Sequence, residues 1–138
     1  MSFVLDASVA LAWLLPVPAT RDAVAASAAL EQLRAPSAIA HVPTVWTLEV
    51  SNVLARCELQ GVITQAQSEA YLALLRQLPL RVDSAPGISA LPAVLQMARR
   101  YRLSSYDASY LDLALRLSLP LMTLDRDLRK AADRAGVG

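Results

Sequence analysis

Apolar and polar positions change their period from one segment of this chain to the next, and the changes predict strands and helices in alternation. Short apolar runs bounded by turn residues predict buried strands at 2–5, 38–42, 80–82 and 120–124. Longer segments with apolar residues at every third or fourth position predict helices at 8–15, 20–34, 44–59, 64–78, 88–101 and 105–117, and a last helix between Asp125 and Gly136. Strands that alternate with helices predict an α/β fold, in which a short parallel sheet is covered by helices on both faces.

The residues at the expected helix ends support these boundaries. Ser8 suits the cap of the first helix, and Pro16 should stop that helix. Thr64 and Gln67 form a capping-box pattern before the fourth helix, and Gly61 suits the end of the third. Because no linker, repeat or low-complexity tract divides the sequence, we expect one domain over residues 1–138.

Composition favours a globular protein with a sizeable core. The chain has 138 residues, of which 55% are hydrophobic, and a mean hydropathy of +0.38. Thirteen basic residues nearly balance twelve acidic ones, and a pI of about 7.9 gives no general attraction to nucleic acid. Nucleic-acid contact would therefore need a local basic cluster, although solvated helix surface is the simpler explanation of such clusters. Two clusters qualify: Arg99, Arg100 and Arg102, and Arg126, Arg129, Lys130 and Arg134.

Cysteine content and the N-terminal segment indicate the compartment. The single cysteine, Cys57, excludes an intrachain disulfide and fits a reducing environment. With a single histidine, His41, the chain also lacks the usual structural zinc sets. The apolar run at 9–15 is too short to span a bilayer, and no basic residue precedes it as in a signal peptide. We therefore expect a cytoplasmic protein without a membrane segment.

Four acidic residues lie at the ends or on the apolar faces of the expected elements, where folding alone does not explain a carboxylate. They are Asp6, Glu49, Asp107 and Asp125, in the strings FVLDAS, WTLEVSN, SSYDASYLDLA and LMTLDRDL. The carboxyl ends of parallel strands and the helix starts that follow them meet at one edge of a sheet. Carboxylates that converge repel one another unless a cation neutralises them, so the set predicts a site for a hard divalent metal and for phosphate chemistry.

Each of these residues also has an ordinary structural explanation. Asp6 and Asp125 could be helix caps, and Asp107 could be a favourable acid in the first turn of a helix. Glu49 shares a helix face with apolar residues, where a salt bridge to an arginine would be the alternative to a metal. Asp127 could serve instead of Asp125 or beside it, although Asp125 is nearer the strand end.

Polar residues beside the acids are candidates for accessory roles. Ser8 could hold a backbone amide, a water or a metal-bound oxygen, although a helix cap is the simpler interpretation. Asn52 lies three positions after Glu49 on the same helix, and Thr123 could supply a hydroxyl from the last strand. Asp112 points elsewhere, and with Arg116 four positions later it predicts a solvated ion pair.

The four strings together resemble the PIN-domain nucleases, specifically the VapC-type toxins of bacterial toxin–antitoxin pairs. The matching pieces, VLDASVALAWLL, PTVWTLEVSNVL, LSSYDASYLDLALRL and LPLMTLDRDLRKAA, keep their order over essentially the whole chain. The resemblance implies that Asp6, Glu49, Asp107 and Asp125 form the catalytic metal site and that Ser8, Asn52 and Thr123 surround it. It further implies Mg²⁺ or Mn²⁺, cleavage of RNA, typically tRNA or ribosomal RNA, a homodimer, and inhibition by a small cognate VapB-type antitoxin.

Two other classes of protein remain open at this point. A phospho-receiver domain has similar length and an acidic metal site, but it needs a lysine after its last strands, and Lys130 falls well inside the final helix. A non-catalytic interaction module could keep the fold without the chemistry. Trp13 and Trp46 could stack on a base but are better explained as core or dimer residues. An apolar first helix with Leu11, Leu14 and Leu15 could form a groove for a partner helix, although core packing explains it as well.

Overall fold

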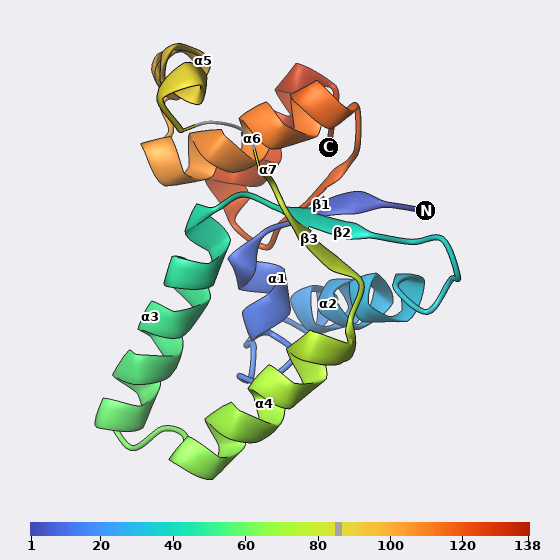
Figure 1. Cartoon of the computed structure of the whole chain (residues 1–138), viewed down its shortest axis with the longest axis vertical. Helices are drawn as coiled ribbons and strands as arrows, with labels where there is room; N and C mark the ends of the chain where they lie inside the picture. Colours follow the sequence, from blue (N-terminus) through green and yellow to red (C-terminus); the bar gives the residue numbers. More distant parts are fainter. Residues whose placement is uncertain (85–86) are drawn as a thin grey trace.

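The computed structural model describes residues 1–84 and 87–138, and strands alternate with helices along it. In chain order the elements are β1 (Phe3–Leu5), α1 (Ala7–Leu11), α2 (Thr20–Gln32), β2 (Ala40–Val42), α3 (Val45–Leu59), α4 (Gln65–Gln77), β3 (Leu80–Val82), α5 (Gly87–Tyr101), α6 (Ser105–Leu117), β4 (Leu121–Met122) and α7 (Arg126–Ala135). The four strands form one parallel sheet in the order β3-β2-β1-β4, with β1 inside and β4 at an edge. Figure 1 shows α5 to α7 on one side of the sheet and α1 to α4 on the other. The predicted α/β fold is confirmed.

The central strand is buried on both faces. Phe3, Val4 and Leu5 have no exposed surface, and neither do Tyr110 and Leu111 of α6. Because successive strand residues point to opposite faces, a strand without an exposed position must be covered by helices on both sides. Packing on both faces therefore fixes the carboxyl end of β1, where the candidate site begins.

Most of the expected helix ends are confirmed. Thr64 and Gln67 make the reciprocal capping box of α4, with N–H···O distances of 3.1 Å and 2.8 Å. The Ser104 hydroxyl caps α6 by accepting the Asp107 N–H at 3.1 Å. Gly61 follows α3 with a φ of 73°, in the left-handed region that glycine adopts without steric cost.

The first helix is shorter than expected, and Ser8 does not cap it. α1 ends at Leu11 and passes into turns before Pro16, because the residue that precedes a proline disfavours helical geometry. Asp6 takes the N-cap position instead, and the Ser8 side chain is engaged elsewhere. Leu11, Leu14 and Leu15 all pack against the core, which agrees with the core-packing explanation of this segment.

Side chains outside the sheet centre also differ from expectation. Asp112 is buried at 7% exposure, so its 2.9 Å ion pair with Arg116 is not a solvated surface pair; Arg116 also bridges to Asp83 at 2.7 Å. Leu48, the residue before Glu49 on α3, is 69% exposed although it is apolar.

Both tryptophans pack into the molecule. Trp46 is buried, and Trp13 packs against the core with its indole N–H donated to the Ala26 carbonyl at 2.8 Å. Neither indole therefore lies open on the surface for a base to stack on. No helix in residues 1–84 or 87–138 has the length and apolarity needed to cross a bilayer.

Candidate active site

Asp6 follows the central strand and is held by two hydroxyl groups. Its side chain is 5% exposed, and Oδ2 accepts hydrogen bonds from Ser8 Oγ at 2.5 Å and from Thr123 Oγ1 at 2.8 Å. Although Asp6 occupies the N-cap position of α1, its side chain makes no capping hydrogen bond. Burial raises the pKa of Asp6, while the two hydroxyl donors lower it and the nearby charge of Asp125 raises it again. The helix-cap explanation of this carboxylate is therefore wrong.

The hydroxyls of Ser8 and Thr123 join the carboxyl ends of β1 and β4. Ser8 Oγ accepts the Leu124 N–H at 3.0 Å, and Thr123 Oγ1 accepts the Asp125 N–H at 3.0 Å. Each hydroxyl thus donates to Asp6 and accepts from the chain that leaves β4. This arrangement fixes the orientation of the Asp6 carboxylate with neutral groups.

Glu49 lies on α3 and is held by a tyrosine from α6. Glu49 Oε1 accepts a hydrogen bond from the Tyr110 hydroxyl at 2.6 Å. Among the described residues no arginine or lysine forms a salt bridge with Glu49, which contradicts the salt-bridge explanation. Burial raises the pKa of Glu49, the hydrogen bond from Tyr110 opposes that shift, and the charge of Asp6 adds to it.

Tyr110 is a site residue that the sequence reasoning missed. It has no exposed surface, and its hydroxyl also accepts the Ala7 N–H at 3.3 Å, so it connects α6 with α3 and with the start of α1. The available signal was a tyrosine on the core-facing stripe of a helix, three positions after Asp107. A buried tyrosine hydroxyl requires a hydrogen-bond partner, which a phenylalanine at that position would not.

Asp107 lies in the first turn of α6, and the charges of the other carboxylates act on it. Burial, and after it the charges of Asp6, Asp125, Glu49 and Asp127, together raise its pKa to about 6. Asp107 therefore lies within electrostatic range of the other three predicted acids. Asp107 does occupy the first turn of α6, as the helix-dipole explanation requires, but burial and the neighbouring carboxylates outweigh any lowering of its pKa by the dipole.

Asp125 retains a helix-capping role. Its Oδ2 accepts the Leu128 N–H of α7 at 2.8 Å, and its side chain is exposed. The capping explanation is therefore confirmed for Asp125, although its charge also acts on Asp6 and Asp107. Asp127 is exposed one position further along and acts on Asp107 as well, so it stays beside the cluster.

Asn52 is exposed at the outer margin of the site. With Val45, Leu48, Glu49 and Tyr106 it lines a surface cavity of about 380 Å³. The two largest apolar members of this lining are strongly exposed, Leu48 at 69% and Tyr106 at 60%. Glu49 thus stands between the buried acids and an apolar surface.

The electrostatics of the cluster fit a hard cation better than any partner within the chain. No salt bridge joins Asp6, Glu49, Asp107 or Asp125 to a basic side chain in the described part of the chain. Carboxylate oxygens are the ligands that Mg²⁺ and Mn²⁺ prefer. The side chains are not preassembled, since no group of three or more His, Cys, Asp or Glu residues in 1–84 and 87–138 is arranged to hold a metal ion. The residue types and their shared charge nevertheless fit such an ion.

Comparison with known proteins agrees with this architecture. Ribonuclease VapC3 of Mycobacterium tuberculosis, from strains CDC 1551 / Oshkosh and ATCC 25618 / H37Rv, is 36% identical over 91 residues, which are 66% of this chain and 64% of the relative. The matched region thus spans just under two thirds of these curated relatives. The crystal structure of PAE2754 from Pyrobaculum aerophilum matches 95% of this chain and 84% of that chain with a TM-score of 0.69; at 23% identity it supports the fold alone.

The family assignment rests on nearly the full length. A model of the PIN domain family matches residues 3–134. The sheet order β3-β2-β1-β4 also differs from the 2-1-3-4-5 order of receiver domains, which removes that alternative. Whether residues 1–138 form the complete domain stays a prediction. The chain belongs to the PIN domain family.

Proposed function

We propose that this chain is a metal-dependent endoribonuclease that acts in the cytoplasm as the toxin of a toxin–antitoxin pair. The observation that carries the proposal is a cluster of carboxylates in a PIN-domain fold, for which the described residues provide no basic partner. The similarity to proteins named ribonuclease VapC3 supports RNA as the substrate.

Mg²⁺ or Mn²⁺ would be held by the four acids Asp6, Glu49, Asp107 and Asp125, with Ser8, Thr123 and Asn52 as accessory groups. Such an ion supplies a water of lowered pKa and neutralises charge on the phosphate oxygens. The hydrogen bonds described above go to one oxygen of each carboxylate: Oδ2 of Asp6, Oε1 of Glu49 and Oδ2 of Asp125. These carboxylates therefore keep acceptor capacity that would serve to hold a cation.

The reaction assigned to the site is hydrolysis of a phosphodiester bond. A water oxygen attacks phosphorus in line, the bond from phosphorus to the 3′ oxygen breaks, and that oxygen takes up a proton. The products are a 5′-phosphate and a 3′-hydroxyl. Chemistry through the ribose 2′-hydroxyl would need a general acid and base, and the only histidine, His41, lies on β2 with its pKa lowered by burial and by Arg81.

The same proposal includes three partners of the chain. It forms a homodimer, a VapB-type antitoxin inhibits it, and its RNA target is a tRNA or a ribosomal RNA. Exposed apolar side chains support protein partners: Ile88, Leu91 and Leu95 occupy one stripe of α5 with exposures of 87%, 62% and 44%. Apolar surface of this kind on a small protein commonly meets a partner.

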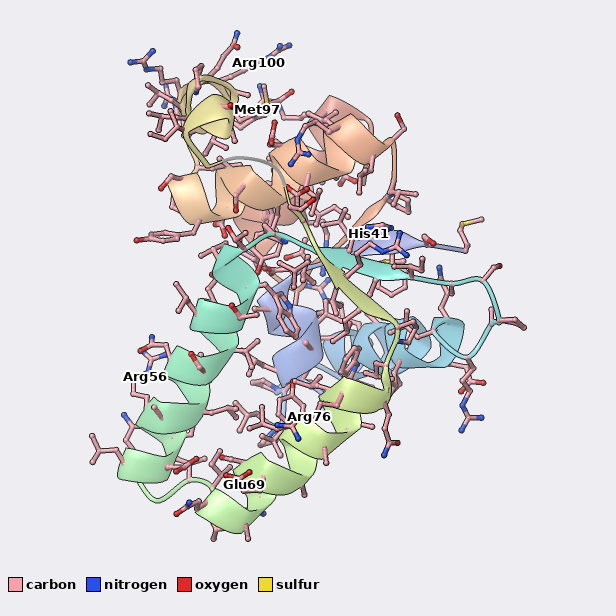
Figure 2. The ribbon with its side chains drawn as sticks, in the orientation of Figure 1. His41, Arg56, Glu69, Arg76, Met97 and Arg100 are labelled. Carbon is pink, nitrogen blue, oxygen red and sulfur yellow. The ribbon has the colours of Figure 1, made fainter. Side chains whose placement is uncertain are left out.

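The decisive experiment is a cleavage assay on total cellular RNA with purified, antitoxin-free protein in Mg²⁺, Mn²⁺ or EDTA. Asp6→Asn and Glu49→Gln remove one charge each from the cluster, and Glu69→Gln is the matched control on the outer surface of α4 (Figure 2). We expect discrete fragments with 5′-phosphate ends that need metal, disappear in both site variants and persist in Glu69→Gln.

Two results would contradict the proposal. Cleavage that survives EDTA or persists in both site variants would remove the carboxylates from the chemistry. No cleavage by folded protein, together with no Mg²⁺ or Mn²⁺ uptake in calorimetry, would favour the non-catalytic interaction module.

A further inference from the structure

The face of α7 next to the carboxylate cluster carries basic side chains that the proposed chemistry does not use. A cavity of about 610 Å³ lies between this face and the start of α2, and we call it the α2–α7 cavity. Four basic and two acidic side chains line it together with one leucine: Arg21, Asp22, Leu124, Arg126, Arg129, Lys130 and Asp133. Its volume falls in the range of pockets that hold small organic ligands, so a nucleotide unit fits.

The α2–α7 cavity is built from segments that are far apart in the sequence. Arg126, Arg129 and Lys130 lie three and four positions apart, which places them on one face of α7. Arg21 comes from the first turn of α2. An ordinary solvated helix face has no second element opposite it. Here the start of α2 lies opposite α7 and makes the surface concave, which distinguishes this basic cluster from ordinary helix surface.

Its cations are available to a ligand. Arg21, Arg126 and Lys130 are exposed, and none of them forms a salt bridge within residues 1–84 and 87–138. Arg129 is half-buried, and its Nη2 donates to the Thr123 carbonyl at 2.8 Å. A guanidinium has five N–H donors, so Arg129 is oriented by one bond and keeps others for a phosphate.

The α2–α7 cavity is connected to the candidate active site through the chain that follows β4. Leu124 and Arg126 flank Asp125 in the sequence, and Arg129 is bonded to the residue whose hydroxyl holds Asp6. An RNA chain entering this edge brings phosphates toward several carboxylates, which repel them. Cations immediately beside the acids offset that repulsion and hold the backbone in place.

We propose that the α2–α7 cavity binds the phosphate backbone of the RNA substrate next to the bond that is cut. The inference rests on the proposed ribonuclease function and assigns the path of its substrate. Arginine pairs with phosphate through two parallel hydrogen bonds, and three of the four cations are arginines. RNA is favoured over an acidic protein segment because Leu124 and Arg126, the two residues that flank Asp125, line the cavity, so a bound backbone would continue toward the carboxylates.

The test measures RNA binding in EDTA, so that binding is separated from cleavage. Fluorescence anisotropy of a labelled single-stranded RNA of mixed sequence is recorded over a series of salt concentrations. The test variant is Arg126→Ala/Lys130→Ala, and the control is Arg56→Ala/Arg76→Ala, which removes the same charge from α3 and α4 (Figure 2). All four side chains are exposed and without salt bridges among the described residues, so both variants should keep the wild-type Tm.

We expect the cavity variant to bind RNA at least tenfold more weakly at low salt. Loss of two phosphate contacts should also reduce the slope of log K against log salt by about 1.4, from about 0.7 per contact on single strands. The control should match wild type in both quantities.

Equal losses in the two variants, or no loss in either, would overturn the inference. Competition by poly-L-glutamate as effective as competition by unlabelled RNA would instead assign the cavity to an acidic protein segment. If the wild type cleaves RNA but the cavity variant binds normally, only this inference fails. If binding depends on the cavity and the wild type never cleaves, the ribonuclease proposal fails and the RNA site stands.

Discussion

Replacement of Tyr110 by phenylalanine removes a single oxygen atom from the core and leaves the ring in place. Two hydrogen bonds are lost: the 2.6 Å bond to Glu49 and the 3.3 Å bond from the Ala7 N–H. A hydrogen bond to a charged group contributes about 1.5–3 kcal/mol, and an unsatisfied buried amide costs about 1–3 kcal/mol. Glu49 is only half-buried and water can reach its carboxylate, so we expect the free energy of unfolding to fall by about 2 kcal/mol.

The same change should weaken metal binding, because Glu49 loses the group that orients it. Loss of a hydrogen-bond partner behind a metal ligand typically reduces metal affinity by about 10- to 100-fold. A general loss of stability does not produce this effect in protein that is still folded. Calorimetric titration with Mn²⁺ at a temperature well below the Tm therefore separates positioning from stability.

Tyr71 provides a matched control for this experiment. It is 3% exposed, and its hydroxyl donates to the Ala10 carbonyl at 2.5 Å, away from the carboxylates. Tyr71→Phe should lower the Tm by a similar amount, about 8 °C for 2 kcal/mol, and retain metal affinity and RNA cleavage. If Tyr110→Phe binds Mn²⁺ as tightly as Tyr71→Phe does, Tyr110 supports the fold and does not position Glu49.

Three further predictions follow from the same geometry. The folded pKa of Asp107, about 6, lies above its ordinary value of 3.8, so the folded state binds the proton more tightly than the unfolded state does. Metal-free protein should therefore become more stable by about 1.5 kcal/mol as the pH falls from about 6 to about 4, after allowance for solvent screening. Chemical denaturation across this range should show a flatter profile for Asp107→Asn, and an identical profile would contradict the assignment. Mg²⁺ should raise the Tm more at pH 7.5 than at pH 5, because protons and metal compete for the same carboxylates; equal shifts measured by calorimetry would place the metal elsewhere. Thr64→Ala should cost about 1 kcal/mol in denaturant unfolding through loss of the α4 capping box and leave cleavage unchanged.

The parts of this structure that follow from local rules were predictable from the sequence. The capping box at Thr64, the glycine after α3 and the strand at Leu80–Val82 all appear where the pattern places them. The approach of Asp6 and Asp125 could also be anticipated, because both follow neighbouring parallel strands, β1 and β4, that share a carboxyl edge. These features depend on short stretches of chain and on topology.

Contacts between distant segments were not predictable in the same way. The hydrogen bond from Tyr110 to Glu49 joins residues 61 positions apart, and the bond from Thr123 to Asp6 spans 117 positions. Asp112 was expected in solvent from its i, i+4 partner, whereas packing of α6 buries it. Local spacing identifies a partner for such a side chain but does not determine its burial.

Acids that serve the fold and acids of the candidate site differ in the charge of the group to which they are hydrogen-bonded. Asp112 is buried beside Arg116, and the cation cancels its charge, as expected for an acid that serves the fold. In contrast, Asp6 and Glu49 are held by neutral hydroxyl groups. A neutral donor orients a carboxylate and leaves its negative charge in place. The repulsion within the cluster therefore persists and adds to the effect of burial in raising the pKa values of Asp6, Glu49 and Asp107. Such an arrangement costs stability in the metal-free protein and gains it only when a cation binds. The use of hydroxyls in place of arginines is therefore the physical reason to assign this edge of the sheet to metal-dependent chemistry.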